Sequence, residues 1–284
     1  MATALFKSSR RAKGLLWTAG AALCAGGTAV ILLLIMGYVV VQGIGALSWS
    51  FITHLPHPIG IPDGGVANGI VGTLIIVGIA AVIAFPIGIL LGIYVGVYGH
   101  RHTANAIRFC ADVLASVPSI TIGVFAYALL VAPFKHFSAM SASFAFAILM
   151  VPLIVRTTEG AIRMVPIEMR EAAVALGATD FQAMARCTLI AARPGIVTGL
   201  LLALARVTGE TAPLLFTAFG SQFWELNPNN PMAELSLQIF TYAISPYREW
   251  HEQAWGGALI LILAVFVLSL AARLALRRQP SANA

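Results

Sequence analysis

Long runs of apolar residues, separated by short polar segments, dominate the chain. A helix needs about 20 mainly apolar residues to cross the hydrocarbon core of a bilayer, and six segments are close to or above that length. These segments cover, roughly, residues 15–42, 69–98, 109–132, 142–160, 195–218 and 255–276. Because the apolar runs are continuous and do not alternate with polar residues, they disfavour a transmembrane β-barrel. The pattern therefore predicts an all-α fold, a polytopic membrane bundle of six transmembrane helices.

The composition supports this interpretation. Of the 284 residues, 59% are hydrophobic and only 10% are charged, and the mean hydropathy is +0.90. A soluble domain carries about 25% charged residues to cover its surface. The first apolar run follows a basic segment but is too long for the hydrophobic region of a signal peptide. We therefore expect it to be the first membrane span.

Lys and Arg residues are unevenly distributed between the two sets of segments that flank the spans. Of the 17 Lys and Arg residues, Lys135 and Arg248 fall in one set, Arg206 falls inside a span, and the other 14 fall in the second set. Basic residues accumulate on the cytoplasmic side of membrane proteins. The second set, which includes both termini, is therefore expected to be cytoplasmic. The net charge of +6 follows from this orientation and does not indicate nucleic-acid binding.

The predicted division of the chain follows from the same orientation. A cytoplasmic N-terminal segment covers residues 1–14, and a cytoplasmic tail covers residues 277–284. The transmembrane domain between them, 15–276, contains cytoplasmic helices at about 161–194.

Small residues inside the apolar runs indicate close helix packing. Gly88, Gly92 and Gly96 recur every four residues, and Gly195 and Gly199 repeat the spacing. Glycines at this spacing let two helix backbones approach, either within the bundle or across a dimer interface. The apolar runs also contain Pro86, Pro118 and Pro152. Because proline lacks a backbone N–H, we expect bends or breaks at these prolines.

The cysteines and histidines do not indicate a metal site or a disulfide framework. Cys24, Cys110 and Cys187 are scattered in or beside apolar runs, and no carboxylate or thiol cluster accompanies the six histidines. The spans also lack a combination of nucleophile and base. We therefore expect no metal, no cofactor and no enzymatic activity in this chain.

Residues 166–189, called the elbow below, have the pattern of two short helices joined by a glycine turn. Gly177 is expected to end the first helix in left-handed geometry. Thr179 followed by Gln182 three residues later is a capping box that begins the second helix. The elbow either docks against another protein or lies as an amphipathic loop on the membrane surface.

Two charged residues, Arg206 and Glu210, lie inside the fifth apolar run. A charge at the centre of a bilayer costs about 2.5–3.5 kcal/mol, so both side chains should face protein or a water-filled pathway. Being four residues apart, they are expected to share a helix face. They either form an ion pair, with each other or with a partner span, that locks the packing, or Arg206 binds an anion in transit while Glu210 limits the affinity. Thr208 and Thr211 add hydroxyl donors beside this arginine.

The elbow also carries a resemblance to a known family. Glu171, Ala172 and Ala173, with Gly177 four residues later, resemble the EAA motif of permease subunits of binding-protein-dependent ABC importers. In that family the segment is a coupling helix that inserts into a cleft of the cytoplasmic ATPase. The family pattern often continues as I-x-L-P, whereas residues 187–190 read Cys-Thr-Leu-Ile, so the bend after the second helix can differ.

A second resemblance is to the phosphate branch of these permeases. It is carried by the sequence ARVTGETAPLL at 205–215, by NGIVGTL at 68–74 and by DVLASVPSI at 112–120. The resemblance continues from 231 to 239 and from 245 to 255. It implies the type I permease fold in a bacterial inner membrane, and it assigns the important intramembrane charges of the family to Arg206 and Glu210.

The same resemblance implies the partners. They are a second, homologous permease, two copies of a cytoplasmic ATPase, an external phosphate-binding protein and membrane lipid. The chain has no Walker A sequence, so ATP hydrolysis would belong to a partner. Two alternatives remain open: another oxyanion cargo, such as sulfate or molybdate, or a regulatory scaffold that senses phosphate.

Overall fold

The computed structural model describes residues 2–61, 63–99 and 102–277, and all regular secondary structure within these ranges is helical. This confirms the predicted all-α fold. Most of the predicted tail, 278–284, lies outside the described residues. The five longest helices are α1 (Ala2–Gly43), α3 (Ala67–Val97), α7 (Ala139–Arg163), α10 (Leu189–Val207) and α13 (Arg248–Arg277).

Shorter helices connect the long ones. Before α7 these are η1 (Ile44–Ala46), α2 (Trp49–Thr53), α4 (His102–Ser116), α5 (Ser119–Ala126), η2 (Tyr127–Val131) and α6 (Ala132–Phe134). After α7 they are α8 (Ile167–Ala175), α9 (Asp180–Ala183), η3 (Met184–Thr188), α11 (Leu214–Thr217) and α12 (Leu235–Ala243).

Within the described residues, five helical stretches are long and apolar enough to cross a membrane, and a bent pair makes up a sixth. The bent pair replaces the predicted third span: α4 and the α5–α6 stretch meet at 100°. The break falls at Pro118, where a bend or break was expected, because proline cannot supply the N–H that a continuous helix needs. By contrast, α3 continues through Pro86 and α7 continues through Pro152.

The predicted fifth span is wrong at both ends. A continuous helical stretch runs from Asp180 to Val207, so the second helix of the elbow and the span are one element. It includes the π-helical turn η3 and passes through Pro194. The helix then stops at Val207 and not near residue 218. Residues 208–213 lie outside any helix and connect α10 to the short helix α11, whose N-cap is Pro213.

The core is organised around α7, which packs along α3. A Cβ atom added at Gly88, Gly92 or Gly96 would lie 2.7, 2.5 or 3.0 Å from the side chains of Ile154, Thr158 and Ile162, respectively. On α10, Gly195 and Gly199 similarly face Ala161 and Thr157 of α7. The glycine spacing therefore serves packing inside the chain, where the missing side chains let three helices approach closely.

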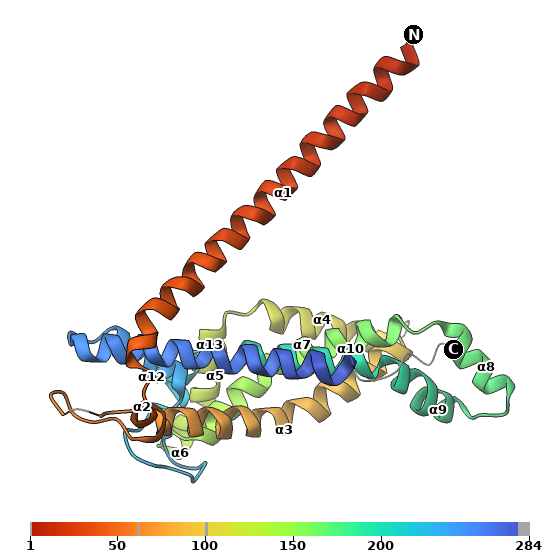
Figure 1. The fold of residues 1–284 in the computed structure, drawn as a ribbon. Coiled ribbons are helices and arrows are strands. Elements are labelled where there is room, and N and C mark those ends of the chain that lie inside the picture. Colours follow the sequence, from red (N-terminus) through yellow and green to blue (C-terminus); the bar gives the residue numbers. More distant parts are fainter. Residues whose placement is uncertain (1, 62, 100–101, 278–284) are drawn as a thin grey trace.

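The two ends of the bundle differ (Figure 1). The short helices α8 and α9 lie at one end, and α2, α6 and α12 lie at the other with the long connecting segments. Helix α1 extends away from the bundle (Figure 1). Its own C-terminal end meets α13: a Cβ on Gly43 would come within 2.6 Å of the Trp255 carbonyl oxygen.

Candidate functional site

The elbow has the predicted local structure. Gly177 has a φ of +90°, and its N–H donates to the Val174 carbonyl while the Ala178 N–H donates to the Ala173 carbonyl. These two bonds form a Schellman motif, which satisfies carbonyls at the end of α8. Thr179 and Gln182 form the predicted capping box at the start of α9. The turn between the two helices is therefore fixed by its own sequence.

The elbow also presents apolar side chains that the described chain leaves uncovered. Ile167 is 65% exposed, Leu176 is 90% exposed and Phe181 is 72% exposed. Of the residues that match the EAA motif, Glu171, Ala172 and Gly177 are exposed and Ala173 is partly buried. Large apolar side chains grouped on an exposed surface are typical of an interaction site.

Arg206 and Glu210 do not share a helix face, contrary to the prediction. Arg206 lies in the last turn of α10, whereas Glu210 follows the end of that helix. Among the described residues, neither side chain takes part in an ion pair. The ion pair between them that was considered as the structural alternative is therefore absent from this part of the chain.

Arg206 instead shares a small cavity with a second arginine. The cavity has a volume of about 90 Å³ and is lined by Arg206 of α10 and Arg156 of α7. Its other lining residues are Leu114, Ala115, Leu149, Pro152 and Leu153. Two arginine side chains thus contribute to the wall of a space that is otherwise apolar, and apolar surroundings strengthen the attraction of a charge for an anion.

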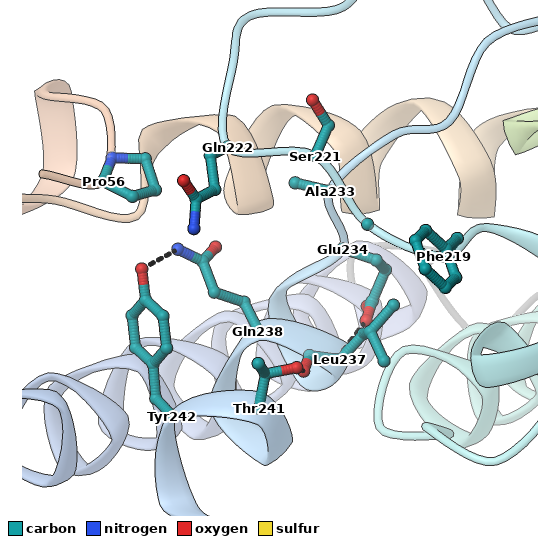
Figure 2. A pocket seen from close by; sticks show the side chains of 11 residues that line it. Pro56, Phe219, Ser221, Gln222, Ala233, Glu234, Leu237, Gln238, Thr241 and Tyr242 are labelled. Carbon is teal, nitrogen blue, oxygen red and sulfur yellow. Dashed lines mark hydrogen bonds between the residues drawn. The ribbon is translucent and has the colours of Figure 1, made fainter. Parts of the chain in front are cut away.

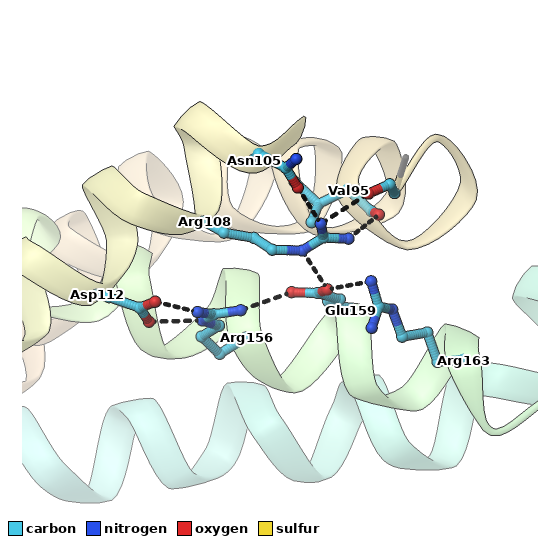
Figure 3. Close-up of polar contacts among 8 residues, drawn as sticks. Val95, Asn105, Arg108, Asp112, Arg156, Glu159 and Arg163 are labelled. Carbon is cyan, nitrogen blue, oxygen red and sulfur yellow. Dashed lines mark hydrogen bonds and ion pairs between the residues drawn. The ribbon is translucent and has the colours of Figure 1, made fainter. Parts of the chain in front are cut away.

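Arg156 belongs to a larger charged cluster, which Figure 3 shows. Its Nε donates to Asp112 at 2.8 Å and its Nη2 also reaches that carboxylate, while its Nη1 is 3.0 Å from Glu159. Glu159 in turn pairs with Arg108 at 2.7 Å and with Arg163 at 3.0 Å. Three arginines therefore surround two carboxylates, and the cluster as a whole carries one excess positive charge.

The cluster joins three helices. Glu159 is almost completely buried on α7, and Arg108 reaches it from α4. Arg108 also donates to the carbonyls of Val95 and Gly99 at the C-terminal end of α3. A cation at this position satisfies carbonyls that lack helical partners. This cluster was not predicted from the sequence, although Asp112, Arg156 and Glu159 are all polar residues inside or at the edge of apolar runs.

The two threonines near Arg206 do not line its cavity. The Thr208 hydroxyl donates to the Leu204 carbonyl at 2.7 Å, and Thr208 faces a separate apolar cavity of about 400 Å³ between α3, α10 and α13. The Thr211 carbonyl accepts from the Leu214 N–H at 3.1 Å. The four predicted pathway residues are thus close in sequence, but only Arg206 faces the small cavity.

Comparison with families places the chain in a known group. Residues 88–279 match the family described as "Binding-protein-dependent transport system inner membrane component". The "Phosphate transport system permease protein PstA" of Yersinia pestis is 42% identical over 82% of this chain and 80% of that protein. The protein of the same description from Haemophilus influenzae is 43% identical over 83% of each chain.

Solved structures support the fold. A chain of the MetNI methionine ABC transporter in an inward-facing conformation covers 75% of this chain and 94% of its own length, with a TM-score of 0.62 and 21% identity. A chain of a bacterial alginate ABC transporter covers 88% of this chain and 93% of its own length, with a TM-score of 0.58 and 15% identity. Both match the helical arrangement expected of a type I ABC importer permease. The chain therefore belongs to the family of binding-protein-dependent transport system inner membrane components, as a multi-pass permease subunit of the PstA group.

Proposed function

We propose that this chain forms half of the translocation pathway of an ATP-driven phosphate importer, with Arg206 and Arg156 contacting the anion. The names of the PstA relatives support phosphate as the cargo. A guanidinium group suits a tetrahedral oxyanion because it donates two parallel hydrogen bonds to it. Arg206 is available for this role, since none of the described residues forms an ion pair with it.

The shared cavity is the observation that carries the proposal. Asp112 and Glu159 largely neutralise Arg156, whereas Arg206, which lines the same cavity, has no acidic partner in the described chain. An anion between the two arginines would receive one full charge and one partly compensated charge. Such a site attracts phosphate yet binds it weakly enough to release it, which transport requires.

The elbow is the proposed docking site for a separate ATPase. Its exposed apolar side chains and its EAA residues are available to a partner at the end of the bundle. The elbow continues into the helical stretch Asp180–Val207, whose 28 residues span about 40 Å and end beside Arg206. Movement of the elbow when the ATPase closes would therefore reach the anion site through one continuous helix.

The remaining partners and the orientation follow from this arrangement. The elbow and both termini are proposed to face the cytoplasm, and the opposite end would receive an external phosphate-binding protein. A second, homologous permease would supply the other half of the pathway, and two ATPase copies would drive the pair. Transport then needs a bundle with two stable arrangements, open in turn to each side.

Copurification of the complex from native membranes, followed by reconstitution in liposomes, tests the proposal. We expect the two-permease, two-ATPase assembly and ATP-dependent phosphate uptake that excess sulfate or molybdate does not suppress. Suppression by either anion would change the assigned cargo. Phosphate uptake by a chain that has no associated ATPase would contradict the proposed mechanism. Unchanged phosphate uptake by an Arg206→Gln variant would also contradict it and would favour a regulatory role.

A further inference from the structure

A third cavity lies at the end of the bundle opposite the elbow. It has a volume of about 240 Å³ and is enclosed by α12 and the segment 219–222, with Pro56 on another side. Its polar lining consists of Ser221, Gln222, Glu234, Gln238, Thr241 and Tyr242. Figure 2 shows these side chains around the cavity, with Tyr242 hydrogen-bonded to Gln238. No Lys, Arg or His is among the residues that line it.

Glu234 is the buried acid of this cavity. It precedes the first residue of α12, is 0% exposed, and accepts the Leu237 N–H at 3.0 Å. In the described part of the chain, no basic side chain forms an ion pair with it. An ionised carboxylate without a cationic partner is costly to bury, so a buried acid of this kind tends to hold a proton.

The hydrogen bonds around Glu234 lead independently to the same result. Ser236 Oγ lies 2.6 Å from Glu234 Oε2 and 3.1 Å from the Glu210 carbonyl oxygen. Thr73 Oγ1 lies 3.1 Å from Glu234 Oε1 and 2.8 Å from the Gly69 carbonyl oxygen. Each hydroxyl has one proton to donate. If Glu234 is ionised, two hydroxyl protons face four acceptor oxygens.

A proton on Glu234 relieves this shortage of donors. Glu234 then donates through Oε2 to Ser236 Oγ, and Ser236 is free to donate to the Glu210 carbonyl. Thr73 Oγ1 already accepts the Leu235 N–H at 2.9 Å, which connects α3 to the start of α12. The neutral acid thus completes a continuous chain of hydrogen bonds from α3 through α12 to the segment that follows Arg206.

We propose that Glu234 is a proton-binding site, and that its bound proton fastens the backbone of Glu210 to α3 and α12. Loss of the proton would draw the Ser236 hydrogen towards Glu234 and release the Glu210 carbonyl. The charged acid would also draw water into the 240 Å³ cavity. The hydrogen bond from Ser236 that anchors residues 208–213 therefore depends on pH at this end of the bundle, whatever anion the chain transports.

The electrostatic surroundings place this change near neutral pH. Burial raises the pKa of Glu234 to about 7, although hydrogen bonds from Ser236, Leu237 and Thr73 lower it in part. The neighbouring elements bring two other titratable residues, Tyr242 and Glu210. Burial raises the pKa of Tyr242, which keeps it neutral, and Glu210 approaches through its backbone carbonyl. From α3, the facing groups are the uncharged Thr73 and Gly69.

Infrared difference spectroscopy of the purified complex, recorded between roughly pH 5.5 and 8.5, tests the proposal directly. We expect a carboxylic-acid C=O band that disappears as the pH rises through about 7. Glu234→Gln should remove this band. Glu225→Gln is the matched control, because Glu225 is an acid in the same connecting segment whose pKa is lowered by hydrogen bonds. A titrating band that survives in Glu234→Gln, or no such band, would overturn the proposal.

Two further measurements keep the test decisive if Glu234→Gln does not assemble. In the wild-type complex, replacing sodium and potassium with choline should leave the pH midpoint of the C=O band unchanged. A shift of that midpoint would indicate a metal-cation site instead. Ser236→Ala removes the partner at 2.6 Å and should shift the C=O frequency. An unchanged frequency in that variant would show that the titrating acid is not Glu234.

Discussion

Arg206 and Arg156 line one cavity, and only Arg156 has acidic partners in the described chain. The asymmetry separates their roles. Arg156 is held in place by Asp112 and Glu159, so its guanidinium is preorganised. Arg206 sits at the end of α10, next to the non-helical segment, where a small movement of the helix changes its distance from Arg156. A site of this kind can be tightened or loosened by motion of a single helix.

Arg206→Gln should reduce phosphate uptake and leave the complex assembled. A charge-assisted hydrogen bond contributes about 1.5–3 kcal/mol, so its removal should lower phosphate uptake by roughly tenfold or more. Uptake of labelled phosphate into proteoliposomes measures the loss, and copurification measures assembly. Arg248→Gln is the control, because that arginine is exposed and lies at the start of α13. If Arg206→Gln prevents assembly, Arg206 serves packing and not transport.

Glu159→Gln should destabilise the permease more than it affects the anion site. The substitution leaves Arg108, Arg156 and Arg163 around a neutral amide, and breaking a buried pair costs about 3–5 kcal/mol. We expect a clear fall in the thermal unfolding midpoint in detergent. Glu168→Gln, on the exposed surface of α8, should leave the midpoint unchanged. Equal midpoints for the two variants would mean that the cluster does not stabilise the bundle.

The apolar runs and the local capping signals were sufficient to predict four of the six spans, the Gly177 turn and the capping box at Thr179. These features depend on residues that are close in sequence. The course of the fifth span was wrong, because α10 ends at Val207 inside the apolar run, where hydropathy alone gives no signal for the end of a helix. The cluster around Glu159 was missed for another reason: Arg108 and Glu159 meet only when α4 packs on α7.

The cavity shared by Arg156 and Arg206 could not be predicted from spacing either. A spacing of four residues suggested Glu210 as the partner of Arg206, and that suggestion assumes a continuous helix. Once α10 ends at Val207, the charged residue that lines a cavity together with Arg206 comes from a different helix, α7. Sequence patterns thus identified Arg206 as important, but its surroundings come from tertiary packing.

Gly92→Val should disrupt the contact between α3 and α7. A Cβ at Gly92 would lie 2.5 Å from the Thr158 Cβ and 2.9 Å from the Val155 carbonyl oxygen, so the helices would have to separate. Overpacking of this kind costs about 1–3 kcal/mol. Thermal unfolding in detergent measures the loss. Gly78→Val in the same helix is the matched control, since no atom lies within 4 Å of the added Cβ. Equal loss in both variants would exclude the packing explanation.

Gly177→Val should uncouple ATP hydrolysis from phosphate uptake without unfolding the bundle. The φ of +90° at this position is strained for a β-branched residue, so the turn of the elbow would change. We expect ATPase activity of the complex to persist while uptake per ATP falls. Gly45→Val, in η1 and with open space around its Cβ, is the control. Normal coupled uptake by Gly177→Val would count against the elbow as the ATPase docking site.

Glu234→Gln should change the pH dependence of stability in a defined direction. Burial raises the pKa of Glu234 from 4.5 to about 7, so the folded chain binds more protons than the unfolded chain between these values. The contribution of Glu234 to the free energy of unfolding is fully present below pH 4.5 and is lost as the pH rises through about 7. The total loss is on the order of 3 kcal/mol, and glutamine, which does not titrate, avoids it.

Thermal unfolding of wild type and Glu234→Gln across this pH range measures the effect. The unfolding midpoint of the variant should rise relative to that of wild type between pH 4.5 and about 7. Above that range the difference should stay level, because Glu234 is then ionised in both the folded and the unfolded state. Glu225→Gln should not show this rise, because hydrogen bonds lower the pKa of Glu225 and the folded chain keeps it ionised. If the difference in unfolding midpoint between Glu234→Gln and wild type stays constant with pH, Glu234 is ionised in the folded protein. The hydrogen bonds that lead to Glu210 then do not depend on a proton on Glu234.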